Sequence, residues 1–238
     1  MTTTAGFIYP DHAAESDYPL AADLLGVALP VTHIYGTDLH AIDELLDLGS
    51  PDKLAAGAKA LAAAEPQSIV WACTSGSFVR GPQGAREQVD ALARVAGVPA
   101  SSTSFSFVAA LHQLGLTRVA VAASYPDEVA TLFADFLAAA EIEVLSISSA
   151  GIATAAEVGT LGPAEVLGLA TANDHPRADA LLIPDTAMHT LAALPQLESQ
   201  LSKPVLTANQ VTIWDGLRLA GHQPSATALG TLFQAEVG

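Results

Sequence analysis

The sequence predicts an α/β protein with two pseudo-symmetric lobes, each a parallel sheet flanked by helices. Short apolar runs alternate with longer, Ala-rich helical segments along the 238 residues of the chain. Regular alternation of strand and helix is typical of a parallel sheet that helices cover on both faces. The length fits one large domain or two lobes of about 100 to 120 residues each. In such sheets, ligands bind at the carboxyl ends of the strands.

The strands are predicted from short apolar runs that turn residues bound. These runs are residues 6–9, 28–35, 68–73, 118–124, 143–147, 180–183 and 204–207. The segments with helical character are residues 51–64, 84–96, 126–140, 191–201 and 210–219. Ser50 is the expected N-cap of the first of these helices and Pro51 its first residue, because Ser and Pro favour those positions.

Two similar strand ends indicate an internal repeat of the same arrangement of strands and helices. The run 68–73 ends in a cluster of hydroxyl residues, and the run 180–183 ends in Pro184, Asp185 and Thr186. We therefore predict a first lobe of residues 1–115 plus 207–238 and a second lobe of residues 116–206. On this division, the helix at 210–219 follows a strand of the second lobe and returns to pack on the first.

Composition and charge exclude several classes of protein. The chain has 25 Asp and Glu against 9 Lys and Arg, a formal net charge of -16. Only 14% of the residues are charged and 50% are hydrophobic, so there is enough apolar surface to bury on folding. An acidic surface without a Lys or Arg cluster lacks the groups that neutralise phosphates. We expect no nucleic-acid partner.

A cytoplasmic, soluble protein is expected. The uncharged stretch 95–117 contains Gly97, Pro99 and several hydroxyl residues, which a membrane-spanning helix does not favour. The N-terminus lacks the basic start of a secretory signal. Cys73 is the single cysteine, so no internal disulfide can form. We expect no membrane partner; a homo-oligomer is a possibility that the sequence leaves open.

No cofactor and no metal are expected. None of the predicted strands ends in a Gly-rich nucleotide-binding motif. A lone cysteine excludes a cysteine-rich zinc or iron–sulfur site. Five histidines are scattered along the chain without the spacing of metal ligands: His33, His40, His112, His175 and His222.

The most informative segment is residues 71–81, with the letters W-A-C-T-S-G-S-F-V-R-G. A thiol at the end of a parallel strand, followed by hydroxyls and a glycine, can present side-chain hydroxyls and backbone N–H groups to an oxyanion. The alternative is that Cys73 is a small buried hydrophobe, as lone cysteines often are. Thiol reactivity discriminates between the two, because a catalytic Cys73 is expected to alkylate quickly at neutral pH.

Four stretches give the chain a family resemblance: residues 6–10, residues 73–81, residues 119–127, and residues 180–191 continuing into 205–221. In these four stretches the sequence resembles the aspartate/glutamate racemase superfamily, and within it the branch of arylmalonate decarboxylases and maleate cis-trans isomerases. The resemblance implies two lobes with the active site in the crevice between them. It also implies one acid/base residue at the end of the equivalent strand in each half.

By that resemblance, the two catalytic positions are Cys73 and Asp185. Maleate isomerases fill the first position with Cys and arylmalonate decarboxylases fill it with Gly, whereas both have Cys at the second. Asp185 is therefore a departure: a carboxylate can act as acid or base, but it is a poor nucleophile, and in its ionised form it repels a dicarboxylate. The alternative for Asp185 is that it caps a helix beginning near Met188.

The resemblance also implies a cradle for a substrate carboxylate. This role falls on the hydroxyls of Thr74, Ser75 and Tyr125 and on backbone N–H groups near Thr186, and the further substrate-binding candidates are Pro10 and His12. Maleate isomerases hold the second carboxylate with two Asn residues, where this sequence has Ala13 and Ala155. The candidates to compensate are Asp11, His12 and His189, and the alternative for each is an ordinary loop or surface residue.

The function that this reading favours is a cofactor-independent isomerase of the maleate cis-trans type. It acts at the α-carbon of a small carboxylic or dicarboxylic acid through a Cys73 thiolate and an enediolate-like intermediate. The alternatives are an arylmalonate-type decarboxylase or a racemase of the same superfamily, or a catalytically altered protein that binds a small acid. The expected partner is a small-molecule carboxylate.

Overall fold

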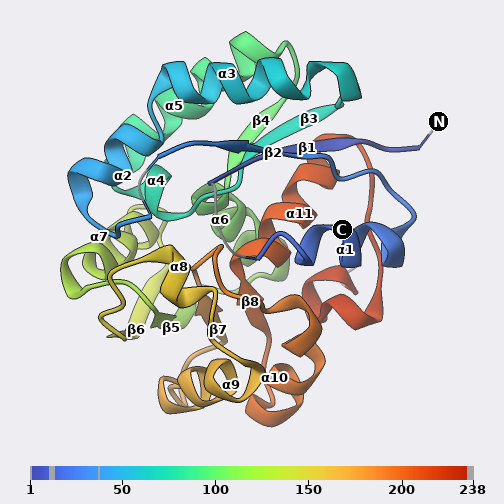
Figure 1. Ribbon diagram of the computed structural model, residues 1–238. Helices are drawn as coiled ribbons and strands as arrows, with labels where there is room; N and C mark the ends of the chain where they lie inside the picture. The colour runs from blue at the N-terminus through green and yellow to red at the C-terminus, as the bar shows by residue number, and fades with distance from the viewer. Residues whose placement is uncertain (1, 11–13, 37, 235–238) are drawn as a thin grey trace.

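Two parallel sheets of four strands each form the framework of the computed structural model, which describes residues 2–10, 14–36 and 38–234. The first sheet has the order β2-β1-β3-β4, and the second has the order β6-β5-β7-β8 (Figure 1). The first comprises β1 (Ala5–Pro10), β2 (Val31–Ile34), β3 (Ser68–Trp71) and β4 (Ala100–Ser102). The second comprises β5 (Arg118–Ala123), β6 (Glu143–Ser149), β7 (Ala180–Ile183) and β8 (Val205–Thr207). The predicted fold class is confirmed.

The helices lie between the strands along the chain. Those of the first half are α1 (Asp17–Leu25), α2 (Ile42–Leu48), α3 (Pro51–Leu61), α4 (Ser75–Phe78), α5 (Gly81–Ala96) and α6 (Thr103–Leu114). Those of the second half are α7 (Asp127–Ala138), α8 (Ala155–Val158), α9 (Pro163–Ala172), α10 (Leu194–Leu201) and α11 (Ala208–Leu219). Single 3-10 turns cover Ala62–Ala64, Leu191–Ala193, Thr227–Leu229 and Thr231–Phe233.

Every predicted strand and helix is present, with shifted ends, but the sequence prediction missed several elements. It missed β4, because two of its three residues are serines and no apolar run marks it. It also missed α1, α2, α4, α6, α8 and α9, and four of these helices, α1, α2, α4 and α6, have no side-chain cap. Ser50 stands at the N-cap of α3 as predicted, although its side chain makes no capping hydrogen bond.

The two sheets have equivalent strand orders, which gives the fold its internal repeat. β1, β2, β3 and β4 correspond in order to β5, β6, β7 and β8. Within each sheet, the order reverses between the first and third strands of the half, that is, between β1 and β3 and between β5 and β7. In open parallel sheets such a reversal leaves a crevice at the carboxyl ends of the strands, where ligands bind.

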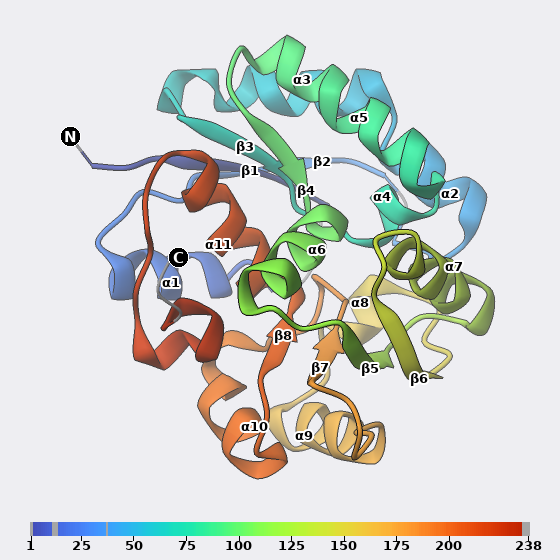
Figure 2. The same cartoon turned by 180° about the vertical axis from the view of Figure 1, so that it is seen from behind.

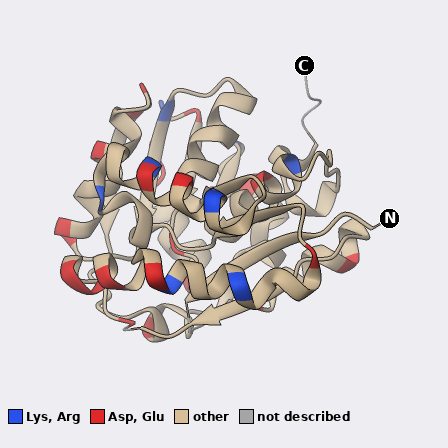
Figure 3. Ribbon diagram, turned by 90° about the horizontal axis from the view of Figure 1, so that it is seen from above, with Lys and Arg blue, Asp and Glu red and all other residues tan. Residues whose placement is uncertain are grey.

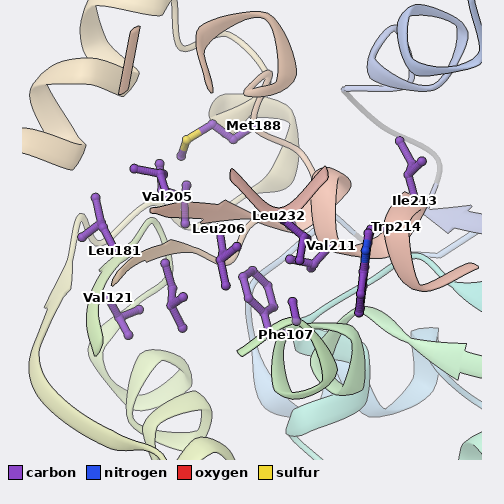
Figure 4. Close-up of a cluster of buried hydrophobic side chains, with 14 of the residues drawn as sticks. Phe107, Val121, Leu181, Met188, Val205, Leu206, Val211, Ile213, Trp214 and Leu232 are labelled. Atoms are coloured by element: carbon purple, nitrogen blue, oxygen red, sulfur yellow. The ribbon is translucent and has the colours of Figure 1, made fainter. Parts of the chain in front are cut away.

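Helices α6 and α11 occupy equivalent places, one after the last strand of each sheet, and pack against each other between the sheets (Figure 2). Helix α11 follows β8 and also contacts β1, β3 and β4 of the first sheet. Thr103 and Thr212 join the two helices by a hydrogen bond of 2.7 Å between their hydroxyls. The main apolar core surrounds them, and Figure 4 shows part of it around Phe107, Leu206 and Trp214.

The division into lobes of 1–115 plus 207–238 and of 116–206 stays a proposal, supported by the strands that each sheet contains. Within the described ranges, no helix is long and apolar enough to cross a membrane. Figure 3 marks acidic and basic residues on the outer helices, and the 25 Asp and Glu against 9 Lys and Arg give the chain its net charge of -16.

Candidate active site

One cavity collects residues from the carboxyl ends of both sheets. Pro10 ends β1, Cys73 follows β3, and Asp185 follows β7. The lining residues are Pro10, Asp38, Leu39, His40, Leu45, Leu48, Cys73, Ser75, Ala155, Asp185, Thr186 and Ala187. The centre of a water molecule can occupy about 30 Å³ of this cavity, which is room for about two waters.

Cys73 is buried at the end of β3, where the chain turns directly into α4. Its Sγ accepts a hydrogen bond from the backbone N–H of Gly76 at 3.3 Å and lies 3.8 Å from the Ser75 hydroxyl. A Cβ at Gly76 would lie 3.2 Å from this Sγ and 3.0 Å from the Trp71 ring, so a larger residue would crowd the thiol. Burial raises the pKa of the Cys73 thiol to about 11, with a smaller increase from the charge of Asp185. At neutral pH the group is therefore a thiol.

Asp185 is 3% exposed and makes contacts through both carboxylate oxygens. The Ser124 hydroxyl donates a hydrogen bond to Oδ2, and the backbone N–H of Ala187 donates to Oδ1 at 2.9 Å. Thr186 and Ala187 form a turn, Met188 lies in a bend, and the next helical residue is Leu191. The alternative that Asp185 caps a helix beginning near Met188 is therefore wrong, and the carboxylate instead accepts a hydrogen bond from the backbone two residues further along the chain.

His40 is a cavity residue that the sequence reasoning missed. Its Nε2 lies 3.8 Å from Asp185 Oδ2, and its Nδ1 lies 3.0 Å from the carbonyl oxygen of Ile152. The ring packs edge-on against that of Tyr125, with 5.0 Å between the centroids. No spacing along the chain relates His40 to Asp185, because the two residues belong to different halves. Ser124 was also missed, although it directly follows β5, the strand beside β7, and a polar residue at a strand end is a sign of a binding site.

Three hydroxyls lie together beside Cys73. Burial raises the pKa of Tyr125 well above its usual value, and the nearby hydroxyls of Thr74 and Ser75 partly oppose this effect. The Tyr125 hydroxyl donates a hydrogen bond of 2.7 Å to the carbonyl oxygen of Pro184. Thr74 Oγ1 is buried without a partner that satisfies hydrogen-bond distance and angle. The Thr74 hydroxyl is thus not engaged in a well-formed hydrogen bond, whereas that of Tyr125 is engaged with Pro184.

A network behind the cavity fixes the backbone at Thr186. The Thr186 carbonyl oxygen accepts hydrogen bonds from the Tyr9 hydroxyl at 2.5 Å and from Asn209 Nδ2 at 3.1 Å. Asn209 also donates to Asp17 Oδ2 at 3.0 Å. Burial raises the pKa of Asp17, while its hydrogen bond from Asn209 opposes the rise. These contacts join β1, α1 and α11 to the turn that carries Asp185.

Two loops from different halves meet over the cavity. Leu39 and Thr154 form an isolated antiparallel bridge. The His40 N–H donates to the carbonyl oxygen of Ala153, and the Ala155 N–H donates to that of Asp38, each at 2.8 Å. Backbone hydrogen bonds therefore join the two halves of the chain at this cavity.

The structure thus brings together Cys73, Asp185, Ser75, Thr186 and Pro10 from among the predicted site residues. Thr74 and Tyr125 lie beside the cavity without lining it. His12, with Asp11 and Ala13, falls outside the described residues.

Other candidates lie elsewhere. His189 is exposed and its Nδ1 lies 3.1 Å from the Ser16 hydroxyl, outside the cavity. Arg80 donates a hydrogen bond to the backbone carbonyl of Leu46. Phe105 packs edge-on against Phe136, with 5.2 Å between the ring centroids, and does not line the cavity. Among the described residues, no group of three or more His, Cys, Asp or Glu side chains is arranged to hold a metal ion.

Comparisons with known proteins agree on one group of relatives. A family model described as arylmalonate decarboxylase matches residues 36–233. The arylmalonate decarboxylase of Bordetella bronchiseptica is 31% identical over 163 residues, which are 67% of this chain and 68% of the relative. The maleate isomerase of Alcaligenes faecalis is 28% identical over 125 residues, 52% of this chain and 49% of that protein. Both relatives are enzymes.

Solved structures show the same fold. A double variant of arylmalonate decarboxylase in its liganded form, in which a glycine became cysteine and a cysteine became serine, has a TM-score of 0.89 at 25% identity. That alignment covers 99% of this chain and 100% of the other. A maleate isomerase of Pseudomonas putida with maleate has a TM-score of 0.91 at 20% identity, covering 99% of this chain and 98% of the other.

Proposed function

The chain belongs to the arylmalonate decarboxylase family, and on that premise we propose that it is an enzyme acting at the α-carbon of a small carboxylic acid. Its reaction passes through an enediolate-like intermediate, and the catalytic residues are Cys73 and Asp185. The observation that carries the proposal is that these two side chains, each from the end of the equivalent strand of its own sheet, line one cavity.

One carboxylate of the substrate has a cradle in this proposal. The Thr74 hydroxyl is buried without a partner, and the Ser75 hydroxyl lies within the cavity wall. Hydroxyl donors that are fixed in place stabilise the negative charge that an enediolate concentrates on the carboxylate oxygens. Tyr125 and the backbone at Thr186 complete the cradle when the Tyr125 hydroxyl turns away from Pro184.

Decarboxylation of a substituted malonic acid is the reaction that this geometry supports best. Leu45, Leu48 and Pro10 give part of the cavity an apolar wall. A second carboxylate against such a wall is poorly solvated, and it loses its charge by leaving as CO₂. The electron pair of the broken C–C bond then enters the enediolate, whose charge the cradle holds.

Cys73 has the protonation state that the next step requires. Because burial raises its pKa to about 11, the side chain is a proton donor at neutral pH. The S–H bond breaks, the proton joins the α-carbon, and the electron pair of the enediolate forms the new C–H bond. Water then returns a proton to the thiolate. The product is expected to have the configuration opposite to that formed by decarboxylases whose only catalytic Cys lies in the second half.

Isomerisation of the maleate type, which the sequence favours, is the second candidate. It is supported by a Cys at the first catalytic position and by the 28% identity to a maleate isomerase. In this reaction the Cys73 thiolate adds to the double bond, the single bond that remains rotates, and the thiolate leaves again. It therefore requires a bound substrate to promote ionisation of Cys73. The cytoplasmic location and the independence from cofactors stay predictions.

A panel of acids tests the proposal. The purified protein is incubated in deuterium oxide with alkyl- and arylmalonates, maleate and α-substituted monocarboxylic acids. Release of CO₂ with one deuterium at the α-carbon supports decarboxylation, conversion of maleate to its trans isomer supports isomerisation, and α-exchange alone supports racemisation. Cys73→Ser is expected to lower the rate by at least a thousandfold. No turnover of any acid, with binding intact, would favour a catalytically altered binding protein.

A further inference from the structure

His40 presents one particular nitrogen to Asp185. The His40 side chain is buried, and its Nδ1 lies 3.0 Å from the carbonyl oxygen of Ile152. A carbonyl oxygen can only accept a hydrogen bond, so Nδ1 carries a hydrogen in every protonation state of the ring. The nitrogen that gains or loses a proton is therefore Nε2, which lies 3.8 Å from Asp185 Oδ2.

The position of Nε2 constrains the proton content of the two groups. A neutral His40 beside an ionised Asp185 would point a lone pair at a carboxylate oxygen, and the buried carboxylate would lack a countercharge. One added proton removes both costs, because it creates either a neutral acid beside a neutral imidazole or an imidazolium–carboxylate pair. The Ser124 hydroxyl and the Ala187 N–H contact Asp185 but cannot provide this proton at ordinary pH.

From this geometry we infer that His40 is a positioning residue for Asp185, and that the two side chains share one proton and serve together as the second acid/base group of the site. The inference rests on the proposed function. It explains how a carboxylate can serve as the acid/base group at a position where relatives have a thiol. The shared proton prevents Asp185 from being an isolated negative charge that repels the carboxylate of the substrate. The cavity then has a proton donor in each half, Cys73 and the His40–Asp185 pair.

The proton transfer balances within this pair. When Asp185 protonates the enediolate, its O–H bond breaks and the electron pair of the enediolate forms the C–H bond. Asp185 is left as a carboxylate beside neutral His40, and the pair regains one proton from water. The reverse step removes the α-proton of a bound acid. Exchange of the α-proton on the Asp185 side of the substrate therefore depends on both Asp185 and His40.

Two substitutions separate a proton-sharing role from a structural one. His40→Asn keeps an amide N–H near the position of Nδ1, for the bond to Ile152, and removes Nε2. His40→Gln places an amide near the position of Nε2 that cannot be protonated. In both variants we expect kcat for α-proton exchange to fall at least tenfold, while KM stays within about threefold. His112→Asn, which changes an exposed histidine of α6, is the matched control and is expected to keep the wild-type rate.

The pH dependence of the exchange is the more specific readout. The titratable groups around the pair are Asp38, Cys73, Tyr9 and Tyr125. The pKa values of the thiol and of both tyrosines are raised by burial, so these groups do not titrate near neutral pH. His40→Asn is expected to change the pH profile of the exchange relative to the wild type, whereas the exposed His112→Asn is expected to leave the profile unchanged.

A measurement without substrate completes the test. In nitrogen-15 spectra, Nδ1 of His40 should be protonated across the pH range, and Asp185→Asn should change the Nε2 signal. An unprotonated Nδ1, an Nε2 signal that Asp185→Asn leaves unaltered, or full exchange activity in His40→Asn would each overturn the inference. Failure of the wild-type protein to turn over any acid would count against the proposed function instead, because the spectra report on the pair alone.

Discussion

Ser68 of β3 donates a hydrogen bond of 2.6 Å to the backbone carbonyl of Gly216 in α11. Both groups are buried, and the contact fastens α11 to the first sheet although the helix follows β8 of the second. Such a close approach of helix and sheet is possible because residue 216 has no side chain. A glycine at position 216 thus permits the close packing of α11 on the first sheet.

Replacement of Gly216 by Ala is expected to destabilise the protein by about 1 to 3 kcal/mol. A Cβ there would lie 3.0 Å from Phe7 Cζ and 3.2 Å from Val70 Cγ2, both in the first sheet. Urea unfolding followed by circular dichroism measures the change. Gly168→Ala in α9 is the matched control: its Cβ would meet nothing within 4 Å, so the higher helix propensity of Ala should raise stability by about 1 kcal/mol. Equal effects of the two substitutions would contradict the packing argument.

Thr74→Val is expected to lower kcat about a hundredfold without lowering stability. The substitution keeps the shape of the side chain and removes the hydroxyl that the proposed cradle uses, and the loss of one such donor costs about 3 kcal/mol of transition-state stabilisation. In the free protein this buried hydroxyl has no partner at good hydrogen-bond distance and angle, so its removal is expected to cost little stability. Rate measurements test the expected loss of activity, and urea unfolding of the same samples tests the expected stability. Unchanged turnover would show that Thr74 does not hold the carboxylate.

The Cys73 thiol is expected to alkylate slowly at neutral pH, which revises the rapid reaction expected of a catalytic cysteine from the sequence. With a pKa of about 11, roughly one molecule in ten thousand carries the thiolate at pH 7. The rate with iodoacetamide should therefore rise about tenfold for each pH unit and level off near pH 11. A bound dicarboxylate should protect the thiol. Rapid alkylation at pH 7 in the absence of ligand would contradict the buried, protonated state.

The same pKa predicts a loss of stability at high pH. The thiol has a folded-state pKa of about 11 against an ordinary value of 9.0, so the folded state binds more protons than the unfolded state between these pH values. This contribution is fully present below pH 9, falls as the pH rises, and amounts to about 3 kcal/mol. Urea unfolding of wild type and Cys73→Ser at pH 7 and pH 10.5 measures it.

The comparison of these two proteins isolates the thiol. Tyr9, Tyr18 and Tyr125 also have pKa values that burial raises, and their effects on stability cancel because both proteins contain them. Wild type is therefore expected to lose more stability between pH 7 and pH 10.5 than Cys73→Ser. Parallel losses in the two proteins would exclude a raised pKa at Cys73.

The sequence by itself determined the framework and part of the site. Strands such as 180–183 are continuous apolar runs, because parallel strands are buried on both faces, and this pattern is local. The same locality placed Cys73 and Asp185 at strand ends, where a parallel sheet gathers its ligand-binding residues. Elements without a local signal, such as the serine-containing β4, were lost, since their burial comes from neighbours distant in sequence.

Only the tertiary structure decided which of these residues meet and in what state. His40 and Asp185 are brought within 3.8 Å by folding, and nothing in the chain between them encodes that distance. The turn at Asp185, the unpartnered hydroxyl of Thr74 and the raised pKa of Cys73 likewise depend on what surrounds each group. The physical reason is that strand formation follows the pattern of neighbouring side chains, whereas protonation and hydrogen bonding follow desolvation and contacts that the whole fold creates.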